Sequence, residues 1–166
     1  VCYLGLISLF VALIACNRIN KKANAIAEKT TNKKDALVDK VFPRFDAYQA
    51  DTKYNKWRFK DFIKVEITPD VKNIFCYGDA IGIDAKYQFA FNCSKETATR
   101  IIEKHNLKPD TSTTDPGYNL QTPFEWWPIL KIKTLKFYSF EGEHSYYKYF
   151  WYDPKEKKAY YFDFDM

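Results

Sequence analysis

Apolar and polar side chains alternate along several short runs in the second half of the chain, a pattern typical of strands in a sheet. The runs that predict strands are 62–67, 71–77, 83–92, 130–140, 146–152 and 159–165. Between the third and fourth runs, Ser94 can cap a helix whose apolar stripe contains Ala98, Ile101, Ile102 and His105. The connectors around 146–152 are short enough for hairpins. The pattern therefore predicts an α+β domain, an antiparallel sheet with a C-terminal three-strand meander and one main helix packed on it.

The segment 106–128 interrupts this pattern. It contains Pro109, Pro116, Pro123 and Pro128, so no regular element is expected in it. Loops of this length in compact domains are usually functional or disordered. Trp126 and Trp127 lie near the end of this segment. We expect one of them to fill the edge of the core and the other to be exposed beside the loop.

The N-terminal pattern is different, because residues 3–15 form an uncharged, mostly apolar run of 13 that ends at Cys16. A spanning helix needs about 20 such residues, whereas a run of this length suits the hydrophobic region of a secretion signal. Leu13-Ile14-Ala15-Cys16 resembles the lipobox of bacterial lipoproteins. The resemblance implies that Cys16 carries lipid, including palmitate-type chains, and that 1–15 is removed. An uncleaved anchor and a buried N-terminal helix are the alternatives.

Most of the net charge of +5 lies in the N-terminal part of the chain and not in the predicted folded domain. Residues 17–41 hold seven basic and three acidic side chains, whereas 42–166 hold 19 basic and 18 acidic ones. A nucleic-acid binder should carry its excess on the folded body, so this function is not expected. The basic excess suits a tether beside anionic headgroups, or simply a solvated linker. The domains expected are a signal peptide (1–15), a lipidated tether with a short helix (16–42) and one α+β domain (43–166).

Few residues suggest chemistry. With Cys2 removed and Cys16 lipidated, Cys76 and Cys93 remain on neighbouring predicted strands, and an oxidising compartment would favour a disulfide between them over two buried thiols. His105 suits the C-terminal end of a helix dipole. His144, near Glu141 and Glu143, lacks a third metal ligand. Without a nucleophile elbow or a phosphate loop, we expect no enzyme, no metal and no cofactor.

Aromatic residues are the more informative feature, since 13 of them fall between residues 137 and 166 and occupy both faces of the meander. A surplus of Tyr mixed with Lys and Asp resembles protein-binding surfaces. The partner-binding residues expected on this basis are Trp126, Trp127, Tyr138, Tyr146, Lys148, Tyr152, Tyr161 and Asp163. Alternatively, the aromatics stabilise the sheet by cross-strand pairing, or a second layer from 43–60 covers them.

These observations predict an envelope lipoprotein, held at a bilayer through acylated Cys16. Resemblance to sorted lipoproteins favours the periplasmic face of the outer membrane, because Asn17 is not an aspartate and no acidic run follows Cys16. We expect the domain to bind another protein without catalysis, for example as an immunity-type inhibitor of a periplasmic toxin. A small-ligand or glycan site on the 106–128 loop and a structural envelope role are the alternatives; the oligomeric state stays open.

Overall fold

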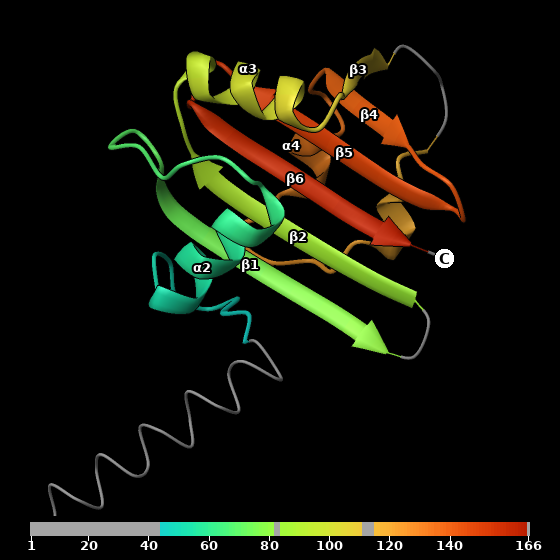
Figure 1. The fold of residues 1–166 in the computed structure, drawn as a ribbon, viewed down its shortest axis with the longest axis horizontal. Helices are drawn as coiled ribbons and strands as arrows, with labels where there is room; N and C mark the ends of the chain where they lie inside the picture. Colours follow the sequence, from blue (N-terminus) through green and yellow to red (C-terminus); the bar gives the residue numbers. More distant parts are fainter. Residues whose placement is uncertain (1–43, 82–83, 111–114, 166) are drawn as a thin grey trace, which may run out of the picture. The chain divides into compact units, whose positions relative to one another are not determined.

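A six-stranded antiparallel sheet forms the centre of the computed structural model, which describes residues 44–81, 84–110 and 115–165 (Figure 1). The strands are β1 (Lys72–Ile81), β2 (Asp84–Asn92), β3 (Lys108–Asp110), β4 (Phe137–Glu141), β5 (Tyr146–Asp153) and β6 (Lys158–Asp165). Their order across the sheet is β1-β2-β6-β5-β4-β3. The predicted α+β class and the meander of β4, β5 and β6 are confirmed.

The N-terminal features expected from the sequence lie outside the described residues. These are the signal peptide 1–15, the lipidated Cys16 and the tether with its short helix, 16–42. They stay predictions. The unit Phe45–Met166 has a core of its own and is described by itself.

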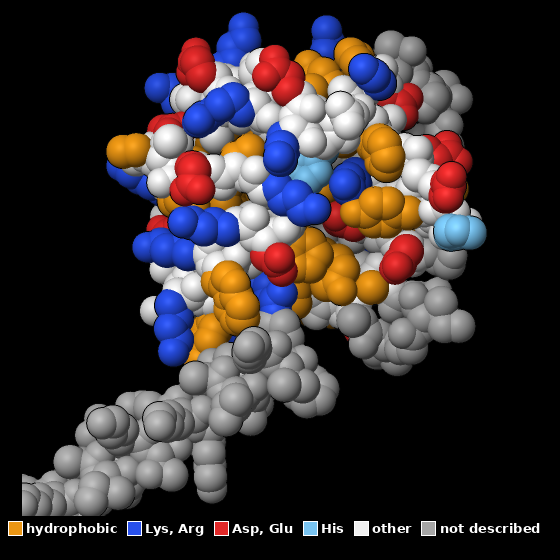
Figure 2. Space-filling model, in the orientation of Figure 1, with side chains coloured by type: hydrophobic (Ala, Val, Ile, Leu, Met, Phe, Trp, Pro, Cys, Tyr) orange, Lys and Arg blue, Asp and Glu red, His pale blue; other side chains and the backbone are white. Residues whose placement is uncertain are grey.

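Two helices pack on one face of the sheet (Figure 1). In α3 (Lys95–Lys104), the hydroxyl of Ser94 accepts a hydrogen bond from the Thr97 backbone N–H at 3.2 Å, which confirms the predicted cap. In α2 (Lys53–Phe62), Thr52 caps in the same way. Figure 2 shows acidic and basic side chains interspersed over this face, so neither sign of charge dominates it.

The expectation of a strand over 62–67 is wrong, because α2 continues through Phe62 and residues 64–67 form no strand. Six alternating residues carry too little information to separate a strand from the end of a helix. In the structure, Phe59 and Ile63 lie four positions apart on α2 and its C-cap, and both are fully buried in the core. The helix thus supplies the second layer that the sequence left as an alternative.

Two other boundaries differ from the expectation. The run 130–140 begins with a helical turn, α4 (Ile129–Ile132), and its strand starts only at Phe137. The segment 106–128 does contain regular structure, namely β3 and the 3-10 turn η1 (Tyr118–Leu120). Pro109 is compatible with β3 because that strand lies at the edge of the sheet, where a missing N–H costs no ladder bond.

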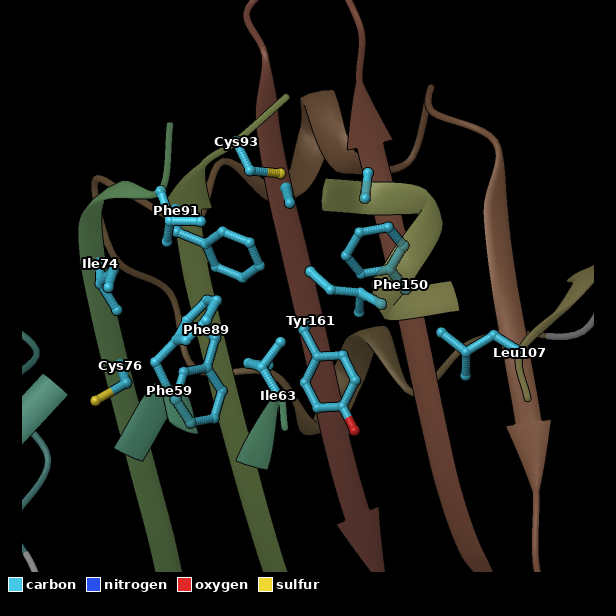
Figure 3. Close-up of a cluster of buried hydrophobic side chains, with 14 residues drawn as sticks. Phe59, Ile63, Ile74, Cys76, Phe89, Phe91, Cys93, Leu107, Phe150 and Tyr161 are labelled. Atoms are coloured by element: carbon cyan, nitrogen blue, oxygen red, sulfur yellow. The ribbon is translucent and has the colours of Figure 1, made fainter. Parts of the chain in front are cut away.

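The core on the α2/α3 face is built from apolar side chains of β1, β2, β5 and β6 together with the two helices (Figure 3). Phe59 and Phe91 meet edge to face, with ring centroids 4.8 Å apart. Figure 3 also shows Tyr161 standing in this cluster with its hydroxyl oxygen directed away from Phe91, toward the C-terminal end of β6. The ring of Tyr161 therefore belongs to the core, while its hydroxyl group reaches the polar side chains at the C-terminal end of β6.

A second core covers the opposite face and is dominated by aromatic rings. Trp127 packs edge to face on Tyr160 and Trp151, with centroid distances of 5.5 and 6.2 Å. Its other buried members are Ala47, Ala90, Trp126, Ile132, Tyr149, Phe162 and Phe164. The aromatic surplus of the meander is thus accounted for by two covered faces, rather than by one exposed face rich in tyrosine.

Asn55 holds the segment before α2 against the edge strand β1. Its side-chain amide donates to the carbonyl oxygens of Asp46, Gln49 and Ile74, each at 2.9 Å. Its oxygen accepts from the Asp46 N–H at 3.0 Å and from the Cys76 thiol at 2.9 Å. Because Asn55 is fully buried, these bonds replace water for five polar groups at once.

Candidate functional site

A polar pocket of about 320 Å³ opens on the α2/α3 face, at the end of the sheet that these helices leave uncovered. It is lined by Asp61, Phe62, Lys64, Ala85, Tyr87, Tyr146, Lys148, Asp163 and Asp165. Its volume lies at the small end of the range of about 300–1,000 Å³ that is usual for ligand sites.

The two-residue period of the strands brings these side chains together. Lys148 on β5 lies opposite Asp163 on β6, and Tyr146 lies opposite Asp165. On β2, Tyr87 lies opposite Asp163 from the other side. Nearer the helices, the same face carries Phe150 and Tyr161, which are buried in the core. The face therefore changes from apolar to polar where the helices end.

Asp163 forms the buried base of the pocket, with only 5% of its surface exposed. Its Oδ2 accepts hydrogen bonds from the hydroxyls of Tyr146 at 2.9 Å and Tyr161 at 3.1 Å. Its Oδ1 accepts none from any described residue. Burial raises the pKa of Asp163, although the tyrosine bonds and Lys148 oppose the shift. The carboxylate is thus positioned by the protein but incompletely neutralised by it.

His105 lies behind the pocket and is a neutral ring. Its Nε2 is 2.8 Å from the carbonyl oxygen of Ile63, which can only accept, so Nε2 carries the hydrogen. Its Nδ1 is then an acceptor, 3.3 Å from Lys148 Nζ and 3.4 Å from the Tyr161 hydroxyl. Burial lowers the pKa of His105 to about 4, and nearby lysines add to the shift. His105 is the C-cap of α3, as its expected place at a helix C-terminus requires, but as a neutral ring it adds no positive charge to the helix dipole.

Lys148 reaches across the pocket toward His105. Its Nζ lies over the rings of Tyr146 and Phe140, at 5.1 and 5.3 Å from their centroids. Burial lowers the pKa of Lys148, and Asp163 offsets part of that shift. Among the described residues, Lys148 forms no ion pair. Within the described ranges, no oxygen atom accepts a hydrogen bond from its ammonium group, which is therefore available to a ligand.

The remaining lining residues give the pocket one aromatic wall and a charged rim. The rings of Phe62 and Tyr87 lie with their centroids 4.4 Å apart. Asp165 accepts from the Ala85 N–H at 2.7 Å, and Asp61 pairs with Arg58 at 3.1 Å. Among the acidic and basic lining side chains, three carboxylates face two lysines.

Of the eight partner-binding residues expected from the sequence, the structure brings four into this network. Tyr146, Lys148 and Asp163 line the pocket, and Tyr161 lies beneath it. The other four lie elsewhere: Tyr138 on β4, Tyr152 with its hydroxyl on the Cys93 carbonyl, and the two tryptophans, Trp126 and Trp127.

Trp126 and Trp127 are both buried, at 7% and 1% exposed, so the expectation of an exposed tryptophan there is wrong. Their indole N–H groups donate to the Ala47 carbonyl at 2.7 Å and to Gln121 Oε1 at 2.9 Å. With apolar contacts and hydrogen bonds both satisfied inside the protein, neither ring is available as a glycan platform.

Sequence reasoning missed several members of the site. His105 and Lys64 come from elements that pack near β5 and β6 only in the folded chain. Asp163 is expected from the sequence on a partner-binding surface, whereas it is buried at the base of the pocket. One signal in the sequence was available: His105 lies in the apolar stripe of a predicted helix. A histidine at such a position is expected to be buried and therefore to need hydrogen-bond partners inside the protein.

The expected disulfide between Cys76 and Cys93 is wrong, because both are free, buried thiols. The strand register explains this. Cys76 lies opposite Phe89, four positions before Cys93 on the partner strand, which is about 13 Å at 3.3 Å per residue. A disulfide needs Cα atoms within about 7 Å. Figure 3 shows the two sulfurs at different places around the core cluster.

The described residues contain no group of three or more His, Cys, Asp or Glu side chains placed to hold a metal ion. In the same part of the chain, no helix is both long enough and apolar enough to cross a bilayer.

No protein-family model, no curated protein and no solved structure matches this chain in sequence or fold.

Proposed function

We propose that the domain is a non-catalytic binding module that holds a small polar ligand in the pocket over Asp163. The observation that carries this proposal is the Asp163 carboxylate in the pocket, with 5% of its surface exposed: two tyrosines hold Oδ2, and no described residue donates a hydrogen bond to Oδ1. That oxygen is not among the buried, unpartnered side-chain atoms, so it stays accessible to solvent, and a ligand that enters the pocket can displace water from it. Perturbed titratable groups in a concave site point the same way.

Binding fits the pocket better than nucleophilic catalysis. The lining residues include no Ser, Thr or Cys that could act as an attacking group. Both ring nitrogens of His105 are engaged by the protein, because Nε2 donates to the Ile63 carbonyl and Nδ1 accepts from Lys148 Nζ. The pocket presents charged groups, hydrogen-bonding groups and an aromatic wall, and these are the features by which proteins bind small ligands.

The protein-partner hypothesis stays a prediction, with less support than the sequence suggested. Trp126, Trp127 and Tyr161 were to be anchors of that surface, yet they are buried within the domain. A buried ring contributes to folding and cannot contribute area to an interface.

The anchor remains part of the proposal on the strength of the Leu13-Ile14-Ala15-Cys16 resemblance. A lipid-anchored tether would keep the pocket near a bilayer on the envelope side, where small solutes pass. Metabolic labelling with palmitate tests this part: the chain should take up label in a bacterial host, and Cys16→Ala should abolish it.

The pocket itself is tested by ligand-detected NMR on the full chain in mild detergent, with a library of amino acids, amines, carboxylates and sugars as probes. We expect at least one class to bind and to shift the amide resonances of Tyr146–Lys148 and Asp163–Asp165. Asp163→Asn should abolish binding. Glu125→Gln is the matched control, since it removes an exposed carboxylate elsewhere. The proposal would be refuted if no probe binds, or if a probe binds the Asp163→Asn variant as tightly as the wild type.

A further inference from the structure

We infer that the ligand is a zwitterion of the α-amino acid class, with its ammonium group on Asp163 Oδ1 and its carboxylate on Lys148 Nζ. This inference rests on the proposed function and names the chemistry of the same pocket. Two charged groups of opposite sign, each held in place by neutral partners, are what the pocket presents to a ligand.

The first step of the argument is placement. Lys148 and Asp163 lie directly opposite each other on β5 and β6, so their Cβ atoms are about 5 Å apart. Despite this, the two side chains form no ion pair. Both line the same cavity. A molecule whose ammonium and carboxylate groups are bonded to the same carbon atom can therefore contact both side chains at once.

The second step is that the protein itself keeps the two charges apart. Tyr146 and Tyr161 hold Oδ2 of Asp163, and His105 Nδ1 lies 3.3 Å from Lys148 Nζ. Each of these partners is neutral, because burial raises the pKa of both tyrosines and lowers that of His105 to about 4. Neutral partners fix geometry without cancelling charge, so a charged ligand finds both groups ready to bind.

The third step excludes simpler ligands. A plain amine would satisfy Asp163 but would bring a second positive charge toward Lys148. A plain carboxylate would satisfy Lys148 but would face Asp61, Asp163 and Asp165. Like charges brought together in a site of low dielectric repel strongly. A zwitterion avoids both penalties.

The aromatic wall suggests where the rest of the ligand lies. Phe62 and Tyr87 stand together on one side of the pocket. An apolar or aromatic side chain could stack there, while the ammonium and carboxylate reach the base. We therefore expect phenylalanine or leucine to bind more tightly than glutamate or lysine.

The experiment is isothermal titration calorimetry on the full chain in mild detergent. The probes are phenylalanine, phenethylamine and 3-phenylpropionate, which share a ring and differ only in their charged groups. We expect phenylalanine to bind at least ~10-fold more tightly than either analogue, because leaving one buried charge unpaired is costly.

Variants assign each charge. Lys148→Met should make phenylalanine bind no better than phenethylamine, and Asp163→Asn should make it bind no better than 3-phenylpropionate. Lys155→Met is the control for Lys148, since Lys155 is exposed on the connector before β6. Melting temperatures of all variants show whether a loss of binding reflects loss of fold.

The outcomes separate the two proposals. If phenethylamine or 3-phenylpropionate equals phenylalanine, or if another probe class shifts the pocket resonances while phenylalanine does not, the zwitterion inference is overturned and the pocket keeps its binding function. If no probe in the wider library binds, the proposed function itself fails.

Discussion

Lys148 lies directly opposite Asp163 on the neighbouring strand, yet its ammonium group turns to Nδ1 of His105, 3.3 Å away. A lysine facing an aspartate usually forms a pair that neutralises both. Here the phenolic hydroxyls of Tyr146 and Tyr161 hold the carboxylate instead. The domain thus maintains two separated charges at the open end of its sheet, and the packing of α2 and α3 decides where that end begins.

The first prediction concerns Asn55, whose side chain satisfies five partners in a fully buried position. Asn55→Ala should lower the free energy of unfolding by about 3–5 kcal/mol, because it leaves the buried Ile74 carbonyl, two partly buried carbonyls and a partly buried N–H without this partner. Urea unfolding measures the loss. Asn119→Ala is the control: it is exposed and should cost less than about 0.5 kcal/mol. A loss below about 1 kcal/mol for Asn55→Ala would mean that the cluster is not a structural centre.

The second prediction uses the four tryptophans as probes of burial. Trp57 is 45% exposed, whereas Trp126, Trp127 and Trp151 are 7%, 1% and 0% exposed. Iodide should therefore quench only the Trp57 emission of the native protein. The variant Trp57→Phe should show almost no iodide quenching, while Trp126→Phe keeps the quenchable component. Strong quenching in Trp57→Phe would show that the aromatic core of the far face is open to solvent.

The third prediction concerns the thiols. Burial raises the pKa of both Cys76 and Cys93 to about 12, so neither is a thiolate at neutral pH. Native protein should alkylate slowly at these positions. In denaturant without reductant, peptide mass spectrometry should find both fully alkylated, and prior reduction should change nothing. Alkylation of the pair only after reduction would demonstrate a disulfide and contradict the structure.

The sequence predicted the parts of the fold that depend on local periodicity. The alternation in 146–152 and 159–165 identifies β5 and β6 and places Tyr146 and Lys148 on the same side of β5, as the structure has it. Period two alone cannot tell how much of that face is covered. Coverage depends on α2, whose ten residues have no clear apolar period and were not recognised as a helix.

The candidate site depends further on contacts between distant segments. His105 lies 43 positions from Lys148 and 42 from Ile63, yet the Ile63 carbonyl fixes its tautomer, and burial together with Lys148 lowers its pKa and keeps it neutral. The aromatics show the same limit. A count of rings on both faces of a meander fits an exposed binding surface and a double core equally well, until the covering segment around Trp127 is placed.

The last prediction concerns the titration of His105, which is 5% exposed and has a pKa lowered to about 4 by burial, with Lys148, Lys64 and Lys104 adding to the shift. In the unfolded chain the pKa is about 6.5. NMR titration of the native protein should place the midpoint of the His105 ring resonance near pH 4.

The sign of the effect on stability follows from this difference. The unfolded chain binds a proton as the pH falls below about 6.5, whereas the native ring stays neutral, so the contribution of His105 is complete above that pH and is lost as the pH falls toward 4. The loss amounts to at most about 3 kcal/mol. Asp163 acts in the opposite direction, because its raised pKa makes protonation favour the native state. The comparison must therefore be made against a variant that removes only the histidine.

His105→Gln serves this purpose, since an amide can still donate to the Ile63 carbonyl and accept from Lys148 but does not titrate. Urea unfolding of both proteins between pH 7 and pH 4 should show the wild type losing stability relative to the variant. The difference should be steepest near pH 5, about midway between the two pKa values. A constant difference across this range would mean that the native ring titrates normally, and the neutral partner that keeps Lys148 charged and unpaired would then be absent at acidic pH.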